Sequence, residues 1–136
     1  MAAKMTSRER MLTAIGGKTP DYVPCSFMIF SGLGHRTKGS VDFIEKQVEM
    51  GLDAINCQVA CMGAASLGAF RGRLTFWGEV DRQHVLPRGT RADVFAAVRE
   101  MRAALYQDGG VIAQCEFGPG ANPDNVAAVF EAWDAT

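Results

Sequence analysis

Apolar positions recur along this chain with two different spacings, and the alternation between them predicts its elements. The clearest spacing is helical: Val94, Val98, Met101 and Leu105 stand at i, i+4, i+7 and i+11, so one face of a helix is apolar. Short, mainly apolar runs, rich in β-branched and aromatic residues, predict buried strands. These runs span residues 22–30, 53–60, 73–77 and 111–115.

Capping signals mark where the predicted helices begin. Two capping boxes, each a Thr followed three residues later by an acidic residue, start at Thr6 and Thr90. A helix capped by Ser40 and a last helix capped by Asn122 are also expected, with a weak helical signal in residues 61–72. The predicted apolar faces of the Ser40 and Asn122 helices are Val41, Ile44 and Val48, and Val126, Val129, Phe130 and Trp133.

Helices and strands therefore alternate along the whole chain. This order predicts an α/β protein with about four mainly parallel strands and flanking helices. The 136 residues fit a single domain. Functional loops are expected at the carboxyl ends of the strands, where parallel α/β proteins place their chemistry.

Composition and charge narrow the class of partner. Fourteen basic and fifteen acidic residues leave a net charge of -1, without the basic patch of a nucleic-acid binder. No apolar stretch is long enough to span a membrane, and the first ten residues are too polar for a secretory signal. The four cysteines have irregular spacing, so reduced thiols are expected. We expect a cytoplasmic protein with a small-molecule or protein partner.

Two stretches carry a specific resemblance to one family. The first resembles the beginning of the uroporphyrinogen decarboxylase (URO-D) superfamily at residues 5–12 (MTSRERML), 20–24 (PDYVP) and 51–55 (GLDAI). The second resembles the family's end at residues 74–83 (LTFWGEVDRQ), 86–90 (LPRGT), 109–112 (GGVI) and 123–125 (PDN).

The resemblance implies a (β/α)8 barrel of which the middle is missing. A complete barrel has about 250 residues, whereas here residues 1–55 resemble the start and residues 62–136 the end of one truncated domain. The seam is expected between residues 51 and 62. Since the last strand of a closed barrel pairs with the first, the expected half barrel of TIM type has its strands in the order third, fourth, first, second.

A half barrel leaves two open sheet edges and an uncovered inner face. Soluble proteins cover such surfaces by pairing with another copy or by other elements. We therefore expect a homodimer, or a poorly folded monomer. The open edges and uncovered face by themselves imply that the chain is either a noncatalytic remnant or a self-associating interaction domain.

Cys115 favours the methyltransferase branch of the superfamily. At this position the family's decarboxylases have His, whereas its zinc-dependent methyltransferases have a Cys that ligates zinc. Such a site needs about three protein ligands. The family's His-x-Cys pair does not occur in this sequence, so His35, His84, Cys57 or Cys61 would have to substitute. The resemblance then implies methyl transfer from a corrinoid-bearing partner protein to a thiol or a similar acceptor.

The alternative activity is that of a uroporphyrinogen carboxy-lyase of porphyrin biosynthesis, which uses no cofactor. The family's Arg-rich loop after the first strand is reduced here to Arg36, the candidate for binding substrate carboxylates. Asp81, after the third strand, and the nearby His84 are the candidate catalytic residues. A loop Asp also commonly caps a turn, so a structural role for Asp81 stays open.

Overall fold

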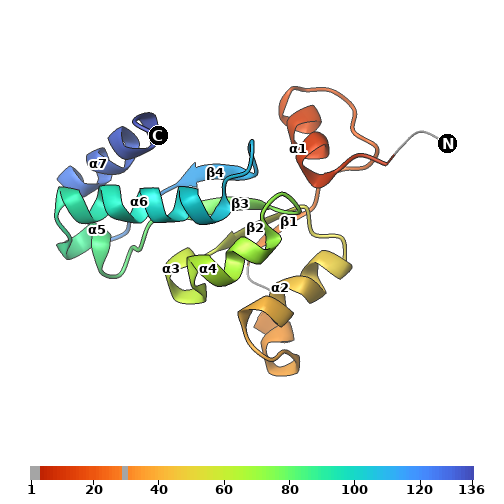
Figure 1. Cartoon of the computed structure of the whole chain (residues 1–136), viewed down its shortest axis with the longest axis horizontal. Coiled ribbons are helices and arrows are strands. Elements are labelled where there is room, and N and C mark those ends of the chain that lie inside the picture. Colours follow the sequence, from red (N-terminus) through yellow and green to blue (C-terminus); the bar gives the residue numbers. More distant parts are fainter. Residues whose placement is uncertain (1–3, 29–30) are drawn as a thin grey trace.

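An open sheet of four parallel strands organises the computed structural model, which describes residues 4–28 and 31–136 (Figure 1). The strands are β1 (Ser26–Met28), β2 (Ala54–Cys57), β3 (Thr75–Glu79) and β4 (Val111–Gln114). Each pairs in parallel with the next. The predicted α/β class with parallel strands is confirmed, and the sheet formed by the described residues is open and does not close into a barrel.

The order of the strands differs from the expected one. They lie in the order β1-β2-β3-β4, so β1 and β4 form opposite edges, whereas the family argument placed them side by side. Ile55 of β2 pairs instead with Phe76 of β3. The reason is the short connection between these two strands, because a single crossover places consecutive parallel strands next to each other.

Helices occupy most of the segments between the strands. The longer ones are α1 (Ser7–Ile15), α2 (Ser40–Glu49), α6 (Arg91–Leu105) and α7 (Pro123–Asp134). The short helices are α3 (Val59–Met62), α4 (Ala64–Leu67) and α5 (Val85–Arg88), with 3-10 turns η1 (Ser31–Arg36) and η2 (Gly68–Phe70). None of the described helices is long and apolar enough to cross a membrane.

Both predicted capping boxes are present. The Thr6 and Thr90 side chains each accept from the backbone N–H three residues later, and the acidic side chain there bonds back to the Thr. The predicted apolar stripe of α6 is buried at all four positions. Sequence signals that act within one helical turn therefore predicted these two helices well.

Two predicted helix faces were wrong in part. Ser40 is the first residue of α2 and not its cap, which is Gly39 at φ +97°, and Phe43, Ile44 and Gln47 form the buried face while Val41 is 46% exposed. In α7, Val129 is buried as expected, but Phe130 is 62% exposed. Asn125 sets the rotation of α7 about its own axis, because its buried amide donates hydrogen bonds to the carbonyl oxygens of Val85, Leu86 and Gly89.

Strand boundaries also moved by a few residues. The predicted strand 53–60 ends at Cys57, since Val59 begins α3, and the predicted strand 73–77 lies at 75–79. The predicted strand 22–30 is seen as Ser26–Met28, and its last two positions lie outside the described residues. Helix α5 was not expected, because its segment contains Pro87 and reads as a polar loop.

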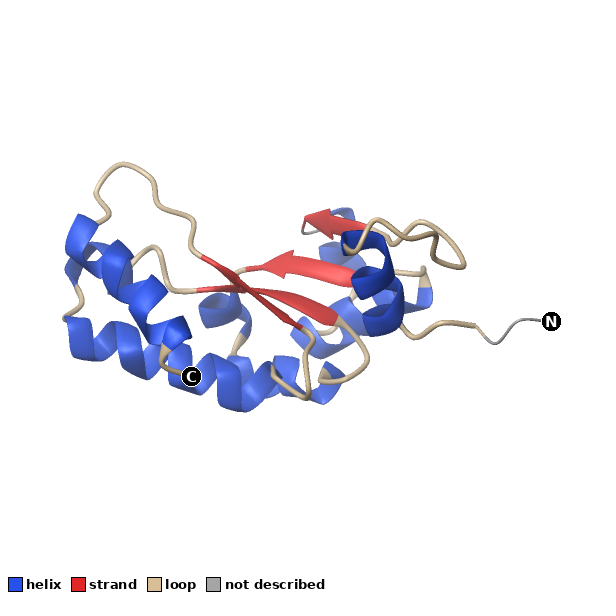
Figure 2. Cartoon of the chain, turned by 90° about the horizontal axis from the view of Figure 1, so that it is seen from above, coloured by secondary structure: helices blue, strands red, loops and turns tan. Residues whose placement is uncertain are grey.

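The two faces of the sheet have different surroundings. Ile55, Cys57 and Phe76 face the helices and belong to the main core. Figure 2 shows most of the helices along one side of the strands. The opposite face, called the open face below, carries side chains that alternate with these along the strands and are not members of that core. They are Ala54, Asn56, Thr75, Trp77, Glu79, Ile112 and Gln114.

Candidate functional site

The candidate site lies at the carboxyl edge of the sheet, where β2, β3 and β4 end. Asp81, two residues beyond β3, accepts hydrogen bonds from the backbone N–H groups of Gln83 (2.7 Å) and His84 (3.0 Å). Its other carboxylate oxygen lies 3.0 Å from Nδ1 of His84. The two predicted catalytic residues are thus brought together by a local turn.

The electrostatics of this pair keep the carboxylate charged. Burial raises the pKa of Asp81, but the two backbone N–H groups and the His84 ring outweigh it, so the pKa lies below its ordinary value. His84 is 70% exposed in its side chain, whereas Asp81 is 19% exposed. An Asp that orients the Nδ1 side of an exposed His leaves the Nε2 side for proton exchange. The same bonds also serve the structural role of a turn, which the sequence left open.

A network of polar side chains connects the carboxyl ends of β2, β3 and β4. Arg82 forms an ion pair with Glu116, which follows β4, and its Nε lies 3.6 Å from Oε1 of Glu79 at the end of β3. With its amide oxygen turned toward Arg82, Gln58 after β2 accepts from Nε at 3.2 Å. We call Gln58, Glu79, Arg82 and Glu116 the carboxyl-edge cluster.

The sequence analysis singled out no member of this cluster, and Glu79 is its most buried one. It is 4% exposed, and burial raises its pKa although Arg82 opposes the shift. Its Oε1 has no hydrogen-bond partner. An acidic residue inside an otherwise apolar strand segment was the available signal, since such a residue is rarely buried without a role.

Two further polar atoms of the open face also lack partners. These are Nε1 of Trp77 and Oε1 of Gln114, both inaccessible to solvent. Glu79 and Gln114 stand opposite each other on β3 and β4, and Trp77 lies two residues before Glu79 on the same face. Buried polar groups are nearly always bonded in folded proteins. Oε1 of Gln47 in α2 and Nε1 of Trp133 in α7 also lack partners, so three of the five such atoms of the described residues gather on this face.

Cys115 lies just beyond β4, at the same edge, but not in a ligand set. It is half-buried and packs against the helix-side core, and burial together with the charge of Glu79 raises its pKa to about 11. Cys57 is buried, and the same causes raise its pKa to about 12. Among the residues that the structure describes, no three His, Cys, Asp or Glu side chains come close enough to hold a metal ion. The residues of one chain therefore do not fit the zinc site that the resemblance implies.

Of the other predicted candidates, Arg36 and His35 lie on η1, whereas Cys61 lines a small pocket together with Asp81. Arg36 is exposed at the end of η1, and His35 beside it and Cys61 in α3 are exposed as well. Within the described residues, no hydrogen bond or ion pair connects Arg36 with Asp81 or with His84. Of the four main candidates, Arg36, Asp81, His84 and Cys115, only Asp81 and His84 are joined directly.

Comparisons with known proteins add no relative to this picture. Neither the family models searched nor the curated proteins contain a match to the chain. Its function is therefore argued from the arrangement of its own residues.

Proposed function

We propose that this chain is a self-associating half barrel of the URO-D superfamily, whose working form is a homodimer. The observation that carries the proposal is the open face, where Trp77, Glu79 and Gln114 hold buried polar atoms without partners. These atoms are out of contact with solvent in the single chain, so pairing across an interface requires their side chains to turn outward. Trp77 then offers a donor and the other two offer acceptors. A two-fold interface uses the same patch on both subunits and suits such a set.

The topology of the sheet supports the same arrangement. Four parallel strands in sequential order present β1 at one edge and β4 at the other. A two-fold axis along the strand direction keeps eight strands parallel and pairs β4 of each copy with β1 of its partner. Both open edges are then closed at once, and eight strands suffice for a barrel with a filled interior.

The edge that would pair is defined by the observed hydrogen bonds. Phe76 donates its N–H to the carbonyl oxygen of Gly110, and Phe76 stands opposite Val111. In a parallel pair, alternate residues direct their backbone groups to the same neighbour. The backbone groups of Val111 and Ala113 therefore point away from β3, toward the free edge.

A substitution at Ala113 tests the proposal without disturbing the β3–β4 pairing. Light scattering on a sizing column should give about twice 14.7 kDa for the wild type. Ala113→Pro removes an outward N–H and should give the monomer mass, whereas the control Ala113→Val keeps that N–H and should remain dimeric. A compact wild-type monomer with cooperative unfolding contradicts the proposal, and so does an Ala113→Pro variant as dimeric as Ala113→Val.

Methyl transfer is the second candidate, and the position of Cys115 at the carboxyl edge favours it over the carboxy-lyase. Zinc would lower the pKa of a bound thiol and so supply an activated nucleophile. Because one chain gathers too few ligands, we derive no catalytic step through zinc. Zinc content measured per chain, with Cys115→Ser as the comparison, tests this candidate independently of the dimer mass. Wild-type protein without stoichiometric zinc, or zinc retained by Cys115→Ser, would exclude it.

A further inference from the structure

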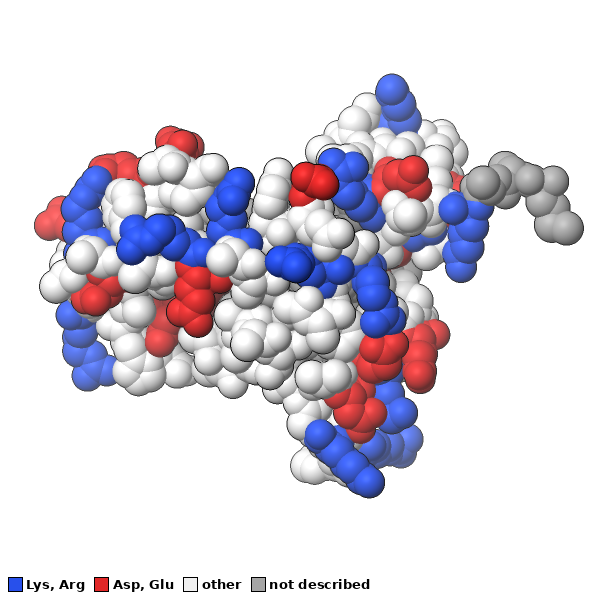
Figure 3. Space-filling model, in the orientation of Figure 1, with Lys and Arg blue, Asp and Glu red and all other residues white. Residues whose placement is uncertain are grey.

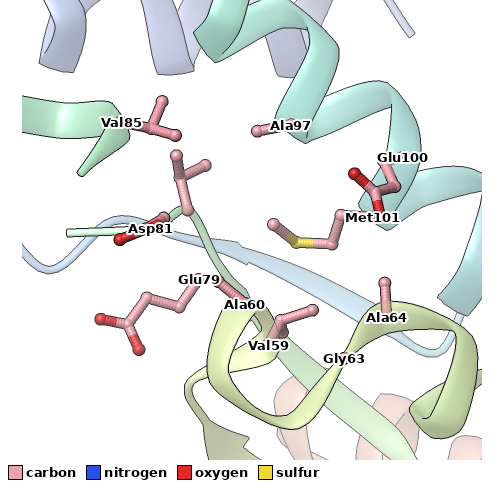
Figure 4. A pocket seen from close by; sticks show the side chains of 11 residues that line it. Val59, Ala60, Gly63, Ala64, Glu79, Asp81, Val85, Ala97, Glu100 and Met101 are labelled. Atoms are coloured by element: carbon pink, nitrogen blue, oxygen red, sulfur yellow. The ribbon is translucent and has the colours of Figure 1, made fainter. Parts of the chain in front are cut away.

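A cavity lies mainly on the helix-covered side of the sheet, and of its lining residues only Glu79 also belongs to the open face of the proposed dimer. It lies between the α3–α4 segment and α6, beside the carboxyl ends of β2 and β3, and has a volume of about 290 Å³ (Figure 4). This volume is near the lower end for small-molecule pockets, which begin at about 300 Å³. We propose that the cavity binds a small organic cation with a compact aliphatic body.

The cavity exists because the crossover from β2 to β3 is broken and its side chains are small. Gly63, at φ +84°, separates α3 from α4, so no continuous helix covers this part of the sheet. Ala60 and Ala64 line one wall and Ala97 of α6 lines the opposite one. Protein interiors are otherwise closely packed, so a space of this size beside the core offers contacts to an apolar occupant.

The floor of the cavity is apolar and rigidly placed. Val59 is 3%, Val80 0% and Met101 4% exposed, and all three belong to the main core. The thioether of Met101 is adaptable and suits contact with an aliphatic ring. An occupant therefore needs an apolar body that packs against a floor which is itself almost out of contact with water.

One carboxylate of the cavity lining takes part in no ion pair among the described residues. Glu79 lies beside Arg82, and Asp81 bonds to His84, whereas Glu100 has no such partner. The Glu79 side chain is directed away from Ala97 and Met101, whereas Glu100 stands beside Met101 on the α6 wall (Figure 4). Acidic and basic side chains are mixed over the face of the molecule seen in Figure 3. The carboxylate of Glu100 favours a cationic occupant over a neutral or anionic one of the same shape.

Three probes of similar shape test whether the cavity binds a compact aliphatic body and whether it prefers a cation. Cyclohexylammonium, cyclohexanol and cyclohexanecarboxylate are titrated into the full chain at constant ionic strength, and amide chemical shifts are followed. We expect shifts at Ala60, Gly63 and Ala97, with the ammonium binding about two- to fivefold more tightly than the alcohol, as a partly exposed charge pair allows. The carboxylate should bind most weakly. Equal affinities for the three probes, or shifts away from these residues, overturn the proposal.

Two variants with matched controls locate the site. Ala97→Leu fills the cavity and should abolish binding, whereas Ala96→Leu on the exposed side of α6 should not change it. Glu100→Gln should reduce the preference for the ammonium over the alcohol, and Glu49→Gln at the end of α2 should not. Unchanged circular dichroism of Ala97→Leu confirms that it is folded, and ammonium binding retained by that folded variant overturns the assignment. Light scattering on the same samples reports the dimer separately, so either proposal can fail alone.

Discussion

Charged clusters lie at both ends of the parallel strands, here called the amino edge and the carboxyl edge, and they differ in whether their buried polar atoms are hydrogen-bonded. At the amino edge, Arg10 is 1% exposed and bonds to Asp21, Asp53 and the carbonyl oxygen of Met5 at 2.5 to 3.0 Å. Its guanidinium also lies 3.6 Å from the centre of the Tyr22 ring. At the carboxyl edge, Glu79 is nearly as buried but keeps an oxygen without a hydrogen bond.

This difference teaches which edge stabilises the fold and which is left for a partner. Asp53 accepts from Ser7, Arg10 and the backbone N–H of Cys25, so it connects α1 with the entry to β1 and the start of β2. Such a saturated network fixes elements in place. Parallel α/β proteins carry stability at the amino edge and function at the carboxyl edge, and the two clusters follow that division.

The strongest test of the comparison removes the centre of the amino-edge network. Arg10→Met leaves the buried Asp53 without its cation and should lower the free energy of unfolding by about 3–5 kcal/mol. Urea denaturation at a fixed protein concentration measures the loss. The control Arg8→Met, at an exposed position of α1, should stay within about 0.5 kcal/mol of the wild type. Equal effects of the two variants would mean that the network does not stabilise the fold.

Acidification should weaken the amino edge next. The hydrogen bond from Arg10 lowers the pKa of Asp21 to about 2, although burial opposes the shift. A folded-state pKa below the unfolded value of about 4 means that the stabilisation is present above pH 4 and is lost as the pH falls toward 2. Urea midpoints between about pH 5 and pH 2.5 should therefore fall more steeply for the wild type than for Asp21→Asn. Parallel pH profiles would contradict this account.

At the carboxyl edge, two substitutions of Asp81 separate the stability that comes from the turn from the stability that comes from the carboxylate charge. Asp81→Ala removes the acceptor of two backbone N–H groups and should cost about 1–2 kcal/mol. Asp81→Asn keeps an oxygen acceptor and should cost less. If both variants lose the same stability, the carboxylate charge and not the turn is what matters. Thermal unfolding of the two variants at one protein concentration provides the measurement.

The smallest expected effect has the opposite sign. Burial raises the pKa of Glu79 in the folded protein above its value in the unfolded chain. The folded protein is therefore fully stabilised when the pH lies below the unfolded-state pKa. It loses that stability as the pH rises through the folded-state pKa and the carboxyl ionises. Glu79→Gln should therefore be slightly more stable than the wild type at pH 7 and equal to it near pH 4, as measured by urea midpoints. If Glu79→Gln is less stable than the wild type at pH 7, Glu79 is an ionised partner of Arg82. Its carboxylate is then as fully paired as those of the amino edge.

Signals within one or two helical turns were predictable from the sequence. The Thr6 and Thr90 capping boxes and the stripe of α6 depend on residues three or four positions apart, whose geometry the helix itself sets. The contact of Asp81 with His84 is of the same kind, since three residues separate them. The assignment of Asp81 and His84 as catalytic residues stays a prediction, because their bonds suit a turn as well.

What depends on distant residues was decided only by the tertiary structure. Arg10 reads as an exposed helix residue until the chain brings Asp53, 43 positions later, within 2.5 Å. The partnerless atoms of Glu79 and Gln114 become neighbours only through the register of β3 and β4. The sequence by itself determined the longer helices, the presence of four strands and their parallel class, because periodicity and capping act locally. Strand order, the burial of charged groups and the open face depend on which strands pair, and pairing is chosen by the packing of the whole chain.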